Sequence, residues 1–253
     1  MTDAKPNHAP LSKNPRVIAS GLLTVLWFTM PLGVSILLLA NLGTVTTWLE
    51  EQGGTGIAIA VAVFAGASGL GLLPTYAQAI VVGWVFGFAI GLPVSVAGYL
   101  GGAVIGFGIS RLVAGESLRA LVDQRPKWRV VRQALVEAST WRTIGIVALV
   151  RFPPKSPFAF SNLVLAASGV RWSTMIIGSI AGMLPRTALA VAIAAQARST
   201  GAQGLKDLIE DKGLVTVVVG VALLIGVFWV MQQIGVRALK AAGLAAEPES
   251  TSA

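Results

Sequence analysis

The sequence predicts an all-α polytopic membrane protein with about four transmembrane helices and two re-entrant helical hairpins, arranged as an inverted repeat. First, the composition is 55% hydrophobic and 12% charged with a mean hydropathy of +0.77, which is typical of polytopic membrane proteins. Second, no charged residue occurs from Gly53 to Ser110. Third, prolines divide apolar sequence into pieces too short to cross a bilayer, because a spanning helix needs about 20 residues.

Four apolar segments are expected to span. They are Val17 to Ala40, with a kink at Pro31, then Pro93 to Ser110, Ser173 to Ala197 and Leu214 to Ile234. Residues 17–240 are therefore expected to form one membrane domain. Residues 1–16 lack the pattern of a cleavage site, so we expect a cytoplasmic tail that leads into a retained anchor. Residues 241–253 are expected to form a disordered tail.

Other segments connect these spans. Asn41 to Gly54 is expected to be an acidic exit loop. Thr55 to Leu73 and Pro74 to Leu92 form two arms that either cross the membrane or make a hairpin, and hydropathy leaves both open. Arg111 to Arg142 has the spacing of a surface helix with one apolar side. That helix either docks on anionic headgroups or is a solvated connector, and we favour the connector.

The charge distribution limits the possible functions. All eleven acidic residues lie outside the long apolar runs, so the membrane part is free of acids. The chain has no cysteine, which excludes disulfides, thiolate metal sites and a cysteine nucleophile. We expect no cofactor, no metal and no nucleic acid partner. With the N-terminus inside, thirteen basic residues lie inside and three outside, so both termini are expected to be cytoplasmic.

A second hairpin is expected around Arg151-Phe152-Pro153-Pro154-Lys155-Ser156-Pro157-Phe158. The apolar runs on either side, Ile144 to Val150 and Phe158 to Val170, are each too short to span. Irregular backbone at membrane depth is tolerated only where protein or a wet cavity surrounds it. The prolines therefore predict a turn at mid-depth.

An offset of eighty residues relates the two halves. It places Pro74 on Pro154, Gly98 on Gly178 and Gly102 on Gly182. Glycines at every fourth position let helices approach closely in lipid. Paired broken segments in corresponding places are typical of an inverted repeat with its binding site at the repeat interface.

The chemistry of these breaks predicts an anion site. Ser156-Pro157 and Pro74-Thr75 are expected helix starts, and helix N-termini bind anions. Arg151, Lys155 and Arg186 lie beside these helix starts in the sequence. Placing one such cation at mid-bilayer costs about 2.5 to 3.5 kcal/mol of free energy. Either the cations bind a phosphate, or their side chains extend to the membrane surface. Asn162 either lines a headgroup path or makes a helix contact, and we favour the contact.

At these residues the sequence resembles the DedA superfamily, in particular its VTT-domain (SNARE-associated Golgi protein) branch. The resemblance covers about residues 66–197. It rests on four motifs, which are Leu73-Pro74-Thr75 followed by Gly83-Trp84-Val85-Phe86-Gly87, Ser110-Arg111, the stretch from Arg151 to Phe158 with Asn162 and Gly169, and Gly182-Met183-Leu184-Pro185-Arg186.

The resemblance implies two facing hairpins in the plasma membrane that move a phosphate-bearing lipid, a phospholipid or a polyprenyl phosphate, between leaflets as a scramblase or flippase. Its binding residues would be Arg151, Lys155 and Arg186, near Pro74, Thr75, Pro154, Ser156, Pro157 and Asn162. The chain departs from the family in having no acid near the first hairpin and Pro157 where a second arginine is usual. An enzyme acting on lipid phosphates and a membrane scaffold are the alternatives; the enzyme is disfavoured for want of a nucleophile.

Overall fold

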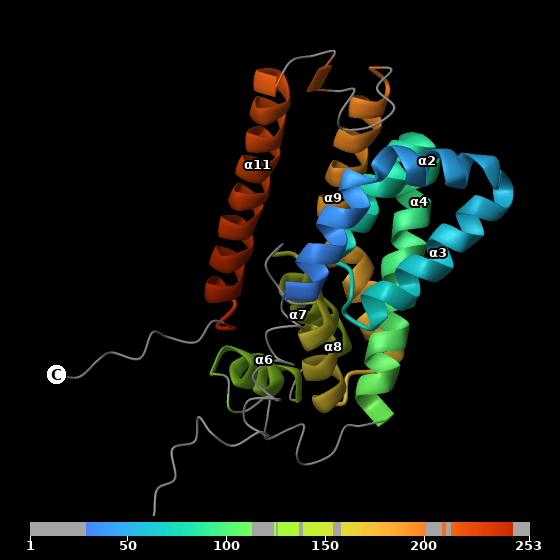
Figure 1. Cartoon of the computed structure of the whole chain (residues 1–253). Coiled ribbons are helices and arrows are strands. Elements are labelled where there is room, and N and C mark those ends of the chain that lie inside the picture. The colour runs from blue at the N-terminus through green and yellow to red at the C-terminus, as the bar shows by residue number, and fades with distance from the viewer. Residues whose placement is uncertain are drawn as a thin grey trace, which may run out of the picture.

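The computed structural model describes residues 29–112, 124, 126–136, 139–153, 158–200, 209–210 and 214–244. All regular secondary structure in these residues is helical (Figure 1). After a helix over Thr29–Ala40, the helices are α2 (Leu42–Glu51), α3 (Gly54–Gly69), α4 (Thr75–Leu112), α6 (Pro126–Val136), α7 (Thr140–Arg151), α8 (Phe158–Ala167), α9 (Trp172–Arg198) and α11 (Leu214–Ala241).

Two of these helices, α4 and α9, are long and apolar enough to cross a membrane. The number rises to three if the bent pair Thr29–Ala40 and Leu42–Glu51 is one span. The predicted class, a helical membrane protein, is therefore confirmed. Helix α9 matches the span expected at Ser173 to Ala197, and α11 continues beyond the expected end at Ile234.

Helix α4 consists of two limbs that meet at Gly87. This residue has φ 69° and ψ −174°, a conformation essentially restricted to glycine. The expected break at Gly91-Leu92-Pro93 is therefore wrong by about one turn. Pro93 remains inside the second limb, because membrane helices tolerate the loss of one backbone hydrogen bond, whereas Gly87 reverses the chain direction.

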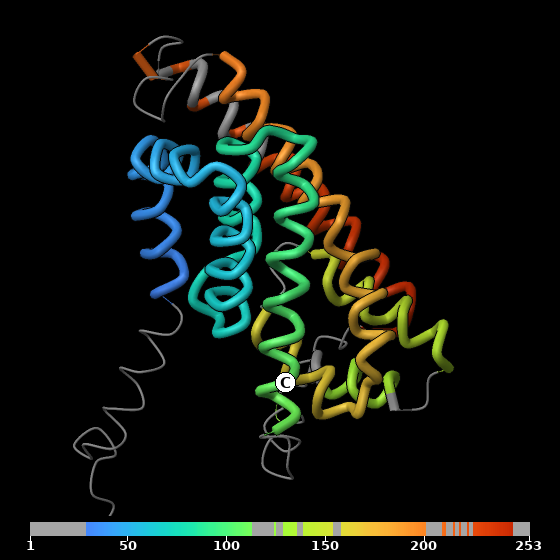
Figure 2. Tube along the Cα trace, turned by 90° about the vertical axis from the view of Figure 1, so that its right-hand side faces the viewer, coloured from blue at the N-terminus to red at the C-terminus, as the bar shows by residue number. Residues whose placement is uncertain are grey.

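Two helix–break–helix units open toward opposite ends of the bundle. Helix α3 and the first limb of α4 are joined at Leu70 to Pro74 and open toward the end that carries α2 (Figures 1 and 2). Helices α7 and α8 open toward the end that carries α6. The second limb of α4 and the whole of α9 run along the length of the bundle beside them (Figure 2). The helix ends that border the two breaks consequently lie in its interior.

Close glycine contacts join each unit to its long neighbour. A Cβ atom at Gly98 would lie 3.3 Å from Cβ of Phe64, and one at Gly178 would lie 2.9 Å from the carbonyl oxygen of Ile144. One turn further along, Gly102 meets Ser68 and Gly182 meets Ala148. The offset of eighty that relates Gly98 to Gly178 also relates Phe64 to Ile144 and Ser68 to Ala148. The helix contacts thus recur with the sequence pattern.

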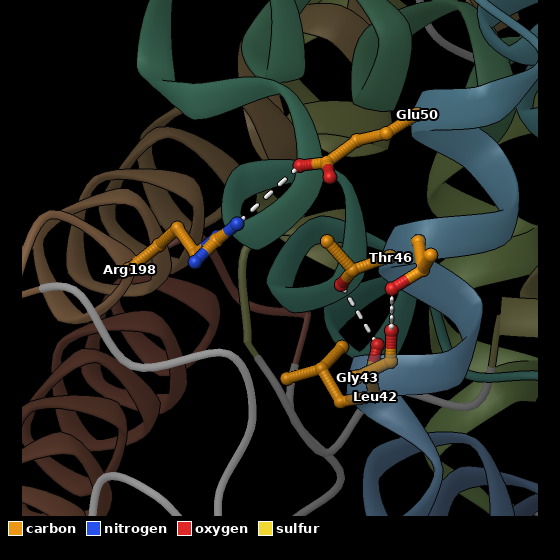
Figure 3. A network of polar contacts seen from close by, with 6 residues as sticks. Leu42, Gly43, Thr46, Glu50 and Arg198 are labelled. Carbon is orange, nitrogen blue, oxygen red and sulfur yellow. Dashed lines mark hydrogen bonds and ion pairs between the residues drawn. The ribbon is translucent and has the colours of Figure 1, made fainter.

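The expected exit loop at Asn41 to Gly54 is wrong, because most of it forms α2. This helix makes an angle of 71° with Thr29–Ala40. Its buried residues, Leu42, Thr46 and Leu49, have the spacing of one helix face. The Thr46 hydroxyl donates to the Leu42 carbonyl over 2.7 Å, and Glu50 pairs with Arg198 at 3.5 Å (Figure 3). The acidic residues thus occupy the exposed side of an amphipathic helix.

A helix with one apolar side, expected within Arg111 to Arg142, is present over part of that range as α6, which buries Val131 and Leu135. Its location on the membrane surface stays a prediction. Parts of the expected segments lie outside the described residues, namely 1–28, 113–123, 125, 137–138, 154–157, 201–208, 211–213 and 245–253. They include the start of the first span and the proline turn of the second hairpin. At the C-terminal end Leu244 is buried against the core, so packing continues a few residues past the expected boundary at Ala241.

The glycine contacts predict that a change of glycine to alanine lowers the stability of the protein at some positions and raises it at others. Gly102→Ala and Gly182→Ala should each destabilise the protein by about 1 to 3 kcal/mol, because the added methyl group meets a neighbouring helix. Gly66→Ala is the matched control in α3, where nothing lies within 4 Å, and it should stabilise by up to about 1 kcal/mol. Thermal unfolding in detergent measures all three. Equal melting temperatures would contradict the packing described above.

Candidate anion site at the helix breaks

Arg151 is the last residue of α7, and its side chain is folded onto the start of α8. It is 2% exposed. Its Nη1 donates to the Ser161 hydroxyl over 2.9 Å and to the Phe158 carbonyl over 3.3 Å, and its Nη2 donates to Asn162 Oδ1. The guanidinium also lies over the Phe158 ring, 4.6 Å from its centroid. Arg151 therefore fastens the two arms of this unit together across the break.

Neutral groups compensate the charge of Arg151. Its described partners are a hydroxyl, a carbonyl, an amide oxygen and an aromatic face, with no carboxylate among them. Asn162 can reach this position because Gly106 lacks a side chain: a Cβ atom there would lie 2.5 Å from Asn162 Nδ2. The preference for Asn162 as a helix contact agrees with this geometry. Direct binding of an anion by Arg151 or Asn162 stays a prediction.

Arg186 occupies the middle of α9 and points to the start of α4. It is 7% exposed, and its Nη2 donates to the Thr75 hydroxyl over 3.1 Å. Thr75 follows Pro74, whose carbonyl accepts the amides of Ala77 and Gln78 at 3.1 and 3.4 Å. The first amides of α4 are left outside the hydrogen bonding of the helix, as at any helix N-terminus. The structure thus joins two predicted site residues, Arg186 and Thr75, that are distant in sequence.

Neither arginine extends to bulk solvent, so the alternative of cations that reach the membrane surface is wrong for Arg151 and Arg186. Both guanidinium groups lie in the interior, and burial is the main electrostatic disadvantage of the charge on each. Their states differ. Arg151 has three described hydrogen bonds and Arg186 has one. The other predicted site residues, Pro154, Lys155, Ser156 and Pro157, lie outside the described residues.

Sequence reasoning missed Tyr99, which lies on the second limb of α4. It is 1% exposed, its hydroxyl has no hydrogen-bond partner in the described part of the chain, and it lies in the neighbourhood of Arg186. A single tyrosine in a glycine-rich span is usually a packing residue, so no sequence pattern singled it out. Gln78 is also buried; its Nε2 donates to the Phe64 carbonyl over 3.0 Å, while its Oε1 is unpartnered.

The protein is thus a helical membrane protein with a basic interior. Two buried arginines, Arg151 and Arg186, bond the first residues of α8 and α4, and aromatic and hydroxyl groups lie around them. No curated protein and no solved structure is significantly similar to the chain. Residues 73–196 match the family model of the VTT domain. The chain therefore carries the domain of the DedA/SNARE-associated Golgi protein family, and the predicted resemblance is confirmed. The expected core, about residues 66–197, agrees closely with the matched region.

Removing the amide oxygen that holds Arg151 should destabilise the second unit. Asn162→Ala leaves Arg151 Nη2 buried without this partner, and the lost hydrogen bond to a charged group corresponds to about 1.5 to 3 kcal/mol. Ser168→Ala is the matched control, since Ser168 bonds only the Val164 carbonyl of its own helix end. Chemical unfolding in detergent should separate the two variants. Equal stability would mean that Asn162 does not hold the guanidinium.

Proposed function

We propose that the protein moves a phosphate-bearing lipid, a phospholipid or a polyprenyl phosphate, between the two leaflets of the plasma membrane. The headgroup passes between the tips of two facing re-entrant hairpins. The observation that carries the proposal is the pair of buried arginines, Arg151 and Arg186, at the helix breaks without an acidic partner among the described residues. Membership of the VTT-domain family supports a lipid-related role in a membrane.

Helix lengths support re-entrance. Helices α3, α7 and α8 have 16, 12 and 10 residues, so at 1.5 Å per residue they extend roughly 24, 18 and 15 Å, short of the roughly 30 Å of bilayer hydrocarbon. In this arrangement each unit enters from one side and turns back at mid-depth. Four segments cross the membrane in this proposal: the predicted first span Val17 to Ala40, the second limb of α4, the whole of α9, and α11. This even number of crossings leaves both termini on the same side, which is the cytoplasm.

Electrostatics supports an anionic passenger. A guanidinium at mid-bilayer costs about 2.5 to 3.5 kcal/mol on insertion scales. Arg151 recovers part of this cost from α8, whereas Arg186 has a single described hydrogen bond, to a neutral hydroxyl. A phosphate oxygen is a better partner for a guanidinium than a hydroxyl is, because charge-assisted hydrogen bonds are stronger. In this proposal Arg186 makes the main direct contact with the phosphate. Arg151, assisted by Lys155, supplies positive charge at the tip of the hairpin formed by α7 and α8.

Arginine substitutions test the proposal in liposomes. With a leaflet-labelled anionic phospholipid, wild-type protein should exchange lipid between leaflets. Arg186→Gln should lower the rate at least about tenfold, the equivalent of 1.4 kcal/mol at the barrier. Arg151→Gln should lower it as well, by weakening the second tip. Arg198→Gln is the matched control; it removes a cation at the rim, which is paired with Glu50, and should leave the rate within about twofold.

The alternatives give different results in the same vesicles. A lipid-phosphate enzyme would generate a new lipid species, which mass spectrometry of the vesicles detects. A scaffold would give neither exchange nor product. Equal loss in Arg198→Gln and Arg186→Gln would show that surface charge, rather than an interior site, controls the rate, and would refute the proposal.

A further inference from the structure

Tyr99 buries a hydroxyl group that has no hydrogen-bond partner among the described residues. The side chain is 1% exposed, and its oxygen has no partner in the described part of the chain. Several buried serines avoid this situation by bonding a carbonyl four residues back, as Ser68 does with Phe64 and Ser110 with Gly106. The tyrosine ring is too long for that solution. Its hydroxyl needs a partner from elsewhere.

Packing alone does not account for a tyrosine at this position. Phe107 lies two helical turns further along the same limb and is 0% exposed, so the limb accommodates an aromatic ring without a hydroxyl. An unpaired buried hydroxyl lowers stability relative to phenylalanine, because the group loses its hydration without compensation. A compensating interaction with a ligand would explain the hydroxyl.

The surroundings of Tyr99 indicate which ligand. The chain has two tyrosines, Tyr76 and Tyr99, and both lie in the neighbourhood of Arg186. Tyr76 is 41% exposed, whereas Tyr99 is enclosed. Arg186 in turn donates to Thr75 at the start of α4. A guanidinium, a phenol and a helix N-terminus are all hydrogen-bond donors or positive groups, and this combination suits a phosphate group.

We propose that the Tyr99 hydroxyl donates a hydrogen bond to the phosphate that Arg186 binds, so that Tyr99, Arg186 and Thr75 form one headgroup site. This inference rests on the proposed function and assigns the site to the first limb, second limb and α9. The ligand class is a lipid phosphate with at least two oxygens free to accept, one for the guanidinium and one for the phenol. Arg151, which is bonded to α8, lies on the opposing side.

Tyr99→Phe tests the inference with two measurements of opposite sign. Without ligand, the variant should melt at the same temperature as wild type or higher, since an unpaired buried hydroxyl is removed. Leaflet exchange should fall about tenfold, because the phosphate loses a hydrogen bond in the site. Stabilisation of the detergent-solubilised protein by dioctanoyl phosphatidic acid, measured as a shift in melting temperature, should fall in parallel.

Ser95→Ala is the matched control. Ser95 lies one turn before Tyr99 on the same limb, is 2% exposed, and its hydroxyl is likewise buried without a partner among the described residues. The variant should gain stability like Tyr99→Phe but keep wild-type exchange and wild-type stabilisation by the lipid. Equal loss of exchange in both variants would attribute the effect to packing of this helix face and overturn the inference.

Failure of the inference differs from failure of the proposed function. Wild-type exchange that persists unchanged in Tyr99→Phe would overturn the role of Tyr99 and leave the transport proposal standing. Absence of exchange by the wild-type protein would refute both. A much lower melting temperature for ligand-free Tyr99→Phe would show that the hydroxyl has a partner within the protein, which also overturns the inference.

Discussion

A guanidinium placed inside a helical bundle without a carboxylate requires polar partners that are neutral, and the fold depends on how Arg151 obtains them. Its hydrogen bonds go to Ser161, Asn162 and the Phe158 carbonyl, all in the first turns of α8. Asn162 fits because Gly106 leaves room on the second limb of α4. A charge at the end of one short helix thus determines how three helices pack, and this explains a glycine at a position where a side chain would otherwise strengthen the helix.

The two halves share their helix contacts but differ in the chemistry of their side chains. The offset of eighty that relates Gly98 to Gly178 also relates Gly106 to Arg186. Each of these two residues meets the break of the opposite unit: Gly106 contacts Asn162, and Arg186 contacts Thr75. At Gly106 the lack of a side chain leaves room for the amide of Asn162, whereas Arg186 at the corresponding position is itself a cation. One framework therefore carries two basic groups whose surroundings differ.

The sequence predicted the parts of the fold that depend on chain composition and regular spacing. Glycines at every fourth position identified the close contacts of the second limb of α4 and of α9, because small residues are what allows helices to approach in lipid. The position of the break in α4 was missed, since Pro93 is a stronger signal than Gly87 in a sequence but a weaker constraint inside a membrane helix. Helix α2 was missed because its acidic residues hid an apolar face.

At the site, the sequence identified the residues but not their relations. Acid-free apolar surroundings singled out Arg151 and Arg186, and both are buried. That Asn162 holds one and Thr75 meets the other depends on side-chain directions across helices distant in sequence, which no local pattern specifies. Tyr99 illustrates the same limit, because the unusual feature of a buried phenol is the lack of a partner, which only a folded structure reveals.

The different states of the two arginines bear on how a headgroup could both enter and leave. A site that moves its passenger must bind it well enough to admit it and weakly enough to release it. Two unengaged guanidinium groups facing one phosphate would form two bidentate pairs, among the strongest polar contacts in proteins. Fastening Arg151 to α8 reduces its direct contribution and preserves its charge. In the proposed transport, Arg186, which is bonded to a neutral hydroxyl, exchanges that partner for a phosphate oxygen and takes it back when the lipid leaves.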